Sequence, residues 1–268
     1  MTGRRARLRV GTSGWQYDDW RGRFYPEDVP RRAWLRWYAG RFDTVEVNNP
    51  FYQLPAARTF DAWRAEVPAG FTFALKFSRY GSHMKRLRAP RGTLGRFLRR
   101  AERLRARLGP ILVQLPPRWR ADPGRLAAFL DAAPRGYRWA VELRDPSWLS
   151  DAVYRVLADH DAALCIHDLL ADHPRVVTTG WVYLRFHGRH YAGRYAPATL
   201  RAWARWIRAR LAAGLDVYAY FNNDVGGAAV LDAAELRRYV AGRRAAQGAA
   251  RRCNDCMWSA SSSRRRRA

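Results

Sequence analysis

The sequence places carboxylates, imidazoles and cations at one recurring position, the end of short apolar segments. In WAVELRDPSW, residues 139–148, the apolar Val141 and Leu143 alternate with charged residues. Successive side chains of a strand point to opposite faces, so Glu142 and Arg144 share one face. That face is either exposed to solvent, as in an amphipathic sheet, or part of a polar pocket.

Polar residues end the other apolar segments as well. The full set is Glu46, Asn48, Lys76, Gln114, Glu142, Arg144, His167, Asp168, Arg185, His187, Asn222, Asn223 and Asp224. Such groups can hold a divalent metal ion, transfer protons or bind phosphate. A structural network of paired charges is the alternative, because buried charges must be paired. Polar residues of this set end seven of the eight segments, and this favours a site, since burying polar groups is costly unless something is bound there.

The segments that carry these residues have the character of strands separated by helices. We predict strands at 8–13, 44–48, 71–78, 111–116, within 139–148, at 163–168, 182–188 and 217–224, and helices at 31–40, 58–66, 92–108, 123–132, 150–160, 197–213 and 226–240. Asp122 is the expected cap of the fourth of these helices. Strands that alternate with helices favour parallel pairing. Eight such units predict an α/β, TIM-barrel-like (β/α)8 fold, with active-site residues at the carboxyl ends of the strands.

An open doubly wound sheet is the alternative fold, but the GxGxxG fingerprint after the first strand is absent. The predicted barrel domain spans residues 8–240. We expect residues 1–7 to be a flexible basic N-terminus and the arginine-rich residues 241–268 to be a disordered tail. Cys253 and Cys256 form one CxxC in that tail, and without a second ligand pair they do not predict a zinc site.

The net charge of +26 is compatible with a nucleic-acid partner. It is carried almost entirely by arginine, because only Lys76 and Lys85 of the 49 basic residues are lysines. No apolar run reaches the roughly 18 residues that a membrane-spanning helix needs. The three cysteines and the absence of an apolar leader predict a cytoplasmic protein without disulfides.

Seven ordered motifs resemble one family. They are GTSGWQYDDWRGRFYP, TVEVNNPFYQLP, FALKFSRYGSH, LGPILVQLPP, AVELRDPSW, YLRFHG and YFNND, over roughly residues 8–240. Together they are similar to the YecE-like family, domain of unknown function 72. The resemblance implies a TIM-barrel-like fold and no settled activity. It departs mildly at Ser82-His83, where members usually have Thr-His. Carried over motif by motif, the implied pocket is Glu46, Asn48, Lys76, His83, Gln114, Glu142, Arg144, Asp168, Arg185, His187 and Asn222.

Metal-assisted hydrolysis of a phosphate-bearing or nucleic-acid-related substrate is the first functional hypothesis. We predict Glu46, Lys76, Glu142, Asp168 and His187 as catalytic groups, and Asn48, His83, Gln114, Arg144, Arg185 and Asn222 as substrate-binding groups. The carboxylates and the imidazole suit Mg²⁺, Mn²⁺ or Zn²⁺, and a bound metal would activate water. The cations would neutralise phosphate charge. Individual metal ligands are not assigned.

Two other hypotheses use the same pocket. In metal-free acid/base catalysis on a sugar or small anion, Glu142 stays ionised beside Arg144 and Glu46 donates a proton. Two carboxyls of unequal pKa are also the usual pair for glycoside cleavage. Lys76 could instead form a Schiff base if it is desolvated. In the remaining hypothesis the pocket is a non-catalytic module that binds an anion or a nucleic acid, since a fold does not determine a function.

Overall fold

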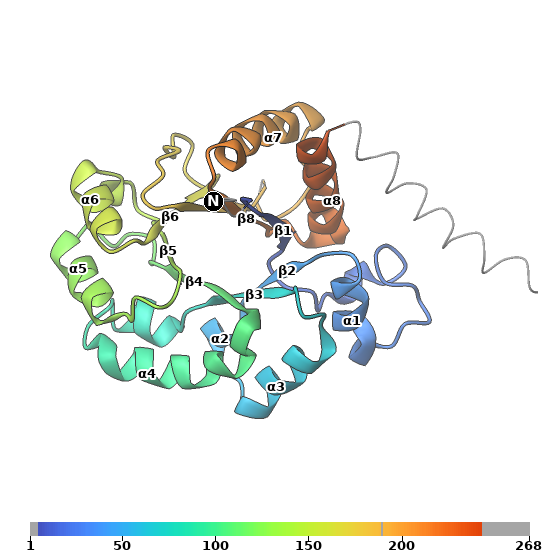
Figure 1. The fold of residues 1–268 in the computed structure, drawn as a ribbon, viewed down its shortest axis with the longest axis horizontal. Coiled ribbons are helices and arrows are strands. Elements are labelled where there is room, and N and C mark those ends of the chain that lie inside the picture. The colour runs from blue at the N-terminus through green and yellow to red at the C-terminus, as the bar shows by residue number, and fades with distance from the viewer. Residues whose placement is uncertain (1–4, 189, 243–268) are drawn as a thin grey trace, which may run out of the picture.

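A computed structural model describes residues 5–188 and 190–242 of the chain, and these residues form eight parallel strands surrounded by helices (Figure 1). The strands are β1 (Leu8–Thr12), β2 (Thr44–Val47), β3 (Thr72–Lys76), β4 (Leu108–Gln114), β5 (Trp139–Glu142), β6 (Ala163–His167), β7 (Trp181–Phe186) and β8 (Asp216–Phe221). The predicted TIM-barrel-like fold is therefore confirmed. The predicted 241–268 tail lies almost entirely outside the described residues, as do Cys253, Cys256 and the first four residues.

Helices cover the outside of the strands (Figure 1). They are α1 (Trp34–Ala39), α2 (Asn49–Tyr52), α3 (Ala57–Glu66), α4 (Pro90–Ala101), α5 (Pro123–Ala132), α6 (Asp151–Asp159), α7 (Pro197–Ala212) and α8 (Ala228–Ala241). The predicted cap of α5 is confirmed, because Asp122 Oδ1 accepts a hydrogen bond of 2.9 Å from Arg125 N. In the described part of the chain, no helix is long and apolar enough to cross a membrane.

The predicted helix over 92–108 is wrong in its extent. Helix α4 ends at Ala101, and a 3₁₀ segment, Glu102–Arg107, leads into β4. Arg105 has φ of 53° inside that segment, in the left-handed region, where a helix cannot continue. The chain therefore turns early, and β4 begins at Leu108, three residues before the predicted start.

The strands are hydrogen-bonded in the order β1-β8-β7-β6-β5-β4-β3-β2, and all the pairs are parallel. No ladder joins β1 to β2 in the described residues, and a single bridge between Ser13 and Glu46 links them at their carboxyl ends. We call this contact the β1–β2 seam.

On the amino-terminal side of that bridge, a side chain takes the place of the main-chain ladder. The Tyr38 hydroxyl of α1 accepts a hydrogen bond from Thr12 N at 2.9 Å and donates one to Thr44 O at 3.0 Å. A Cβ on Gly11 would lie 2.2 Å from Thr44 O, so only glycine permits this approach of β1 to β2. The seam is thus closed partly by a tyrosine hydroxyl.

The strand alternation determines where the polar residues lie. A small buried cluster contains Ala74, Leu112, Ala140, Cys165, Tyr183 and Tyr220, one from each of six neighbouring strands. Because residues two apart share a face of a strand, the next side chains on the same face are Lys76, Gln114, Glu142, His167, Arg185 and Asn222. A layer of polar groups therefore lies directly toward the carboxyl ends of the strands, as the alternation predicts.

Candidate functional site

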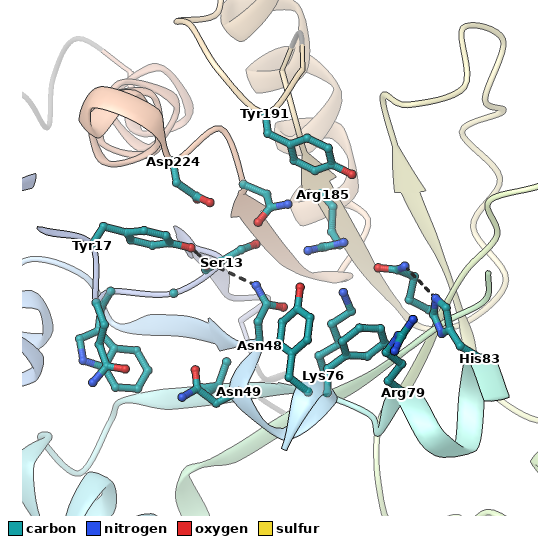
Figure 2. Close-up of a pocket in the computed structure, with 18 of the residues that line it drawn as sticks. Ser13, Tyr17, Asn48, Asn49, Lys76, Arg79, His83, Arg185, Tyr191 and Asp224 are labelled. Atoms are coloured by element: carbon teal, nitrogen blue, oxygen red, sulfur yellow. Dashed lines mark hydrogen bonds between the residues drawn. The ribbon is translucent and has the colours of Figure 1, made fainter. Parts of the chain in front are cut away.

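A cavity of about 670 Å³ opens at the carboxyl ends of the strands (Figure 2). Among the described residues that line it, the cations are Arg31, Lys76, Arg79, Arg144 and Arg185, the amides are Gln16, Asn48, Asn49, Gln114 and Asn222, the aromatic residues are Trp15, Tyr17, Phe51, Tyr52 and Tyr191, and the carboxyl is Asp224. This volume falls in the range of sites for small molecules. The cavity is therefore a polar, predominantly cationic site.

The sequence-predicted residues divide into two groups in the structure. Lys76 and all six predicted binding residues, which are Asn48, His83, Gln114, Arg144, Arg185 and Asn222, line the cavity. The other four predicted catalytic residues, Glu46, Glu142, Asp168 and His187, do not. What these four side chains contact explains the division.

Arg185 lies at the centre of a buried arginine cluster, which we define as Arg185, Glu46 and Glu142. Its guanidinium donates to Glu46 Oε1 at 2.8 Å through Nη2 and to Glu142 Oε2 at 2.5 Å through Nη1. Glu46 also accepts hydrogen bonds of 2.7 Å from the hydroxyls of Ser13 and Tyr183. Both carboxylates are completely buried. They contact the cavity only through lining residues, which are Arg185, Arg144 and Ser13. Buried charges that are paired in this way compensate one another.

Glu142 remains ionised in this cluster. Burial alone would raise the pKa of its carboxyl, but the guanidinium groups of Arg185 and Arg144 outweigh it and hold the pKa well below its usual range. Arg144 Nε donates to Glu142 Oε1. The expectation of an ionised Glu142 beside Arg144 agrees with this geometry. The expected proton donor Glu46 accepts three hydrogen bonds, from Arg185, Ser13 and Tyr183, and does not lie against apolar walls.

His187 contacts Arg185, and Asp168 in turn contacts His187. His187 Nδ1 lies 3.2 Å from Asp168 Oδ1, and His187 Nε2 lies 3.1 Å from Arg185 Nη1. Burial and then the charge of Arg185 lower the pKa of His187, so the imidazole is neutral near pH 7. A neutral ring has one donor and one acceptor, so Nδ1 donates to Asp168 and Nε2 accepts from Arg185. This chain positions the guanidinium.

The donor set does not fit a divalent metal ion. Across residues 5–188 and 190–242, no three side chains of His, Cys, Asp or Glu come together as a metal-binding group. The oxygens of Glu46 and Glu142 accept hydrogen bonds from Arg185 and its neighbours. Asp168 Oδ1 and Oδ2 accept from His187 N, Gly188 N and the Tyr195 hydroxyl. A metal would have to displace these donors.

Lys76 ends β3 and faces the cavity without a carboxylate partner. Its side chain is 6% exposed, and its Nζ lies 4.0 Å from the centroid of the Phe51 ring. No ion pair or hydrogen bond from Nζ exists within the described residues. Burial first, and then the charge of Arg185, lower the pKa of Lys76 to about 8. The amine is therefore much easier to deprotonate than an ordinary lysine.

Asp224 is a cavity carboxyl that the sequence analysis counted among the strand-end polar residues but did not assign to the pocket. It follows β8, two residues after Asn222, and its buried Oδ1 has no hydrogen-bond partner in the described part of the chain. Burial raises its pKa to about 7, although the neighbouring Tyr17 hydroxyl and the charge of Arg185 oppose the rise. Figure 2 shows Asp224 and Tyr17 on one side of the cavity and Lys76 and Arg79 on the other. The strand alternation that selected Asn222 could have selected Asp224 as well.

Arg144 is held across the cavity wall by a row of polar groups. Its Nη1 donates to the Tyr191 hydroxyl at 3.2 Å and its Nη2 to Gln114 Oε1 at 3.4 Å. Gln114 Nε2 in turn lies 3.4 Å from His83 Nε2, and Ser82 Oγ lies 2.9 Å from His83 Nδ1. Burial and the charge of Lys76 lower the pKa of His83 to about 4, so this ring is also neutral near pH 7.

Four further lining residues come from loops that follow the strands. Tyr17 and Arg79 stand within the quoted motifs GTSGWQYDDW and FALKFSRYGSH, whereas Arg31 and Tyr191 lie outside all seven motifs. Loop residues have no alternation to indicate which way they point. For Arg31 and Tyr191 we find no signal in the sequence that would have selected them.

The chain matches known proteins along most of its length. The pattern of the family described as "Protein of unknown function DUF72" matches residues 9–254. UPF0759 protein YecE of Escherichia coli is 34% identical over 119 residues, which span 43% of each chain. UPF0759 protein YunF of Bacillus subtilis is 25% identical over 268 residues, 81% of this chain and 89% of the relative.

A solved structure supports the same relationship. The crystal structure of a DUF72 family protein from Thermotoga maritima is 27% identical, has a TM-score of 0.80, and aligns with 88% of this chain and 100% of its own. The names of these relatives state no activity.

Proposed function

The chain belongs to the DUF72 family of proteins of unknown function, and on that premise we propose that its barrel mouth binds a small phosphate-bearing molecule and catalyses metal-free acid/base chemistry on it. The observation that carries the proposal is the charge of the cavity. Among the described lining residues, five cations face one carboxyl, Asp224, whose pKa of about 7 leaves it partly neutral near pH 7. Such a site favours an anion.

Two of the cations provide charge that no carboxylate offsets. Arg185 and Arg144 are paired with Glu142, and Arg31 forms an exposed ion pair of 3.5 Å with Asp18. Lys76 and Arg79 have no ion-pair partner in the described residues. Guanidinium groups bind phosphate oxygens through charge-assisted hydrogen bonds. We therefore assign phosphate binding to Arg79, on the side of the cavity where Lys76 lies.

Acid/base chemistry is supported by two groups that titrate close to neutral pH. Burial brings the pKa of Asp224 to about 7 and that of Lys76 to about 8. Proton transfer is most effective when the pKa of the catalytic group lies near the working pH. Glu46 and Glu142, the acid and base of the sequence-based hypothesis, are replaced in this proposal because Arg185 holds both.

Metal-assisted hydrolysis is less well supported. The carboxylates that would bind the metal accept hydrogen bonds from Arg185, Arg144 and the Tyr195 hydroxyl. The nucleic-acid hypothesis draws on the net charge of +26 and on the cations of the pocket, whereas a cavity of about 670 Å³ suits a small molecule.

The test is a calorimetric titration of the full chain with glycerol 3-phosphate and, separately, with glycerol. Each titration is done in low salt and in high salt. We expect the phosphate ester to bind and glycerol not to bind, with affinity that falls as salt rises. Excess EDTA should leave the affinity unchanged. Arg79→Gln should weaken binding, whereas the exposed Arg88→Gln, which lies outside the cavity, should not. Equal binding of the two probes would contradict the proposal.

A further inference from the structure

We propose that Lys76 is a nucleophile that forms a Schiff base with the carbonyl group of the phosphate-bearing molecule bound in the cavity. This inference rests on the proposed function and names the substrate class, a phosphorylated aldehyde or ketone. It adds a covalent role to the acid/base chemistry described above.

The surroundings of Lys76 are those of a nucleophile rather than of an ion-pair partner. Its Nζ lies over the face of the Phe51 ring, 4.0 Å from the centroid, and no carboxylate in the described residues pairs with it. The side chain is 6% exposed and lines the cavity. Figure 2 shows its amine pointing toward the space below Arg185. A desolvated lysine next to another cation is an activated amine.

The composition of the chain makes a lysine at this position unusual. Only two of its 49 basic residues are lysines, and the other four cations of the cavity are arginines. Arginine supplies positive charge but cannot lose its proton in a protein, so it cannot attack a carbonyl carbon. The other described cations of the cavity are arginines, so among the described lining residues only position 76 carries an amine.

The proposed step balances with groups in the cavity. The lone pair of neutral Lys76 Nζ attacks the carbonyl carbon, and a carbon–nitrogen bond forms. The carbonyl oxygen then leaves as water, with one hydrogen from the amine and one proton from the Asp224 carboxyl. The products are a protonated imine on Lys76 and the Asp224 carboxylate. Asp224 lies opposite Lys76 across the cavity, with its Oδ1 unpartnered in the described part of the chain (Figure 2).

Both groups are in the required state near neutral pH. Burial lowers the pKa of Lys76 to about 8, so about half of the amine is neutral at pH 8, against less than about 1% for an ordinary lysine. Burial raises the pKa of Asp224 to about 7, so a protonated fraction persists there. The imine withdraws electrons from the bond beside the former carbonyl carbon. The class of reaction served is therefore proton removal or carbon–carbon cleavage next to a carbonyl.

The experiment traps the imine with borohydride, which reduces it to a stable secondary amine. The full-length protein is incubated with glyceraldehyde 3-phosphate or with glyceraldehyde, reduced, and analysed by intact mass and peptide mapping. Lys85 is exposed and outside the cavity, so it is the internal control for unselective labelling. We expect one adduct, on Lys76, at least tenfold more abundant with the phosphorylated probe. Lys85→Arg should keep it and Lys76→Arg should abolish it.

A second measurement needs no variant at Lys76. Glycerol 3-phosphate has no carbonyl group, so it should occupy the cavity and protect Lys76 from labelling in the wild type, with no effect on Lys85. Equal labelling of Lys76, Lys85 and the α-amino group, or an adduct that survives Lys76→Arg, would overturn the inference. If glycerol 3-phosphate binds but no adduct forms, the Schiff base is refuted and the proposed function stands. If neither probe binds, both are refuted.

Discussion

Two neighbouring regions of the barrel contain charged residues of the same kinds and differ in what those residues contact. In the buried arginine cluster, Arg185 is held between Glu46 and Glu142, and each carboxylate has further donors. On the cavity wall, Lys76 has no carboxylate partner and Asp224 has an unpartnered oxygen, within the described residues. A charge that is fully paired supports the fold, and a charge that lacks a partner is available for a ligand.

Removal of the central cation should test the first half of this comparison. Arg185→Met leaves Glu46 buried without a counter-charge and Glu142 with Arg144 alone, so we expect the free energy of unfolding to fall by about 3–5 kcal/mol, measured by urea denaturation. The control is Arg103→Met, which removes an exposed pair with Asp61 and should leave the free energy of unfolding nearly unchanged. Equal losses would mean that the cluster does not stabilise the barrel.

The pH dependence of stability should distinguish Lys76 from an ordinary lysine. Its pKa is lowered to about 8 in the folded protein, so between about pH 8 and 10.5 the unfolded chain binds more protons than the folded one. The stability of the wild type should therefore rise through that window relative to Lys76→Met, by about 3 kcal/mol in total. Parallel profiles for the two proteins would show that Lys76 is not desolvated. Lys85→Met should run parallel to the wild type.

Asp224 is the acid of the proposed covalent step. Asp224→Asn should slow the formation of the borohydride-trapped adduct by about 10²-fold near pH 7, which is the low end of general acid catalysis. The final amount of adduct should be unchanged after long incubation, since Lys76 is intact. Asp28→Asn, an exposed carboxyl outside the cavity, should have no effect. An unchanged rate in Asp224→Asn would assign the proton to another donor.

Arg79 should have the smallest effect, because it is exposed. We expect Arg79→Gln to weaken glycerol 3-phosphate binding by about fivefold to tenfold at low salt, in line with the loss of about 1 kcal/mol from one exposed charge. The difference from the wild type should shrink at high salt. A salt-independent difference would mean that the variant alters the shape of the cavity rather than its charge.

The sequence predicts the barrel well because strands alternate with helices along the chain. It predicts the direction of the polar residues well because side chains alternate between the two faces of a strand. Strand positions two residues apart share a face, and this rule places Lys76, Gln114 and Asn222 in the cavity. The predicted helix over 92–108 is too long at its carboxyl end. The backbone at Arg105 adopts a left-handed conformation, which apolar periodicity does not reveal.

The pairing of charges could not be predicted in the same way. Glu46 and Arg185 are 139 positions apart, and only the closed barrel brings them to 2.8 Å. Once they pair, the Glu46 carboxylate is held by Arg185, and the acid/base role is therefore proposed for Asp224 instead. Alternation identifies which side chains point inward. It does not identify which of them meet a partner, because that depends on side-chain length and on strands distant in the sequence.

The β1–β2 seam has a mechanical consequence for the cavity. The Tyr38 hydroxyl bridges Thr12 and Thr44 where other strand pairs share a main-chain ladder, so these two strands can separate with the loss of few hydrogen bonds. Ser13 follows directly after β1, and the Tyr17 hydroxyl donates to Ser13 O at 2.5 Å. A small widening of the seam would therefore move one rim of the cavity outward. The width of the cavity would then adjust to the size of the bound ligand.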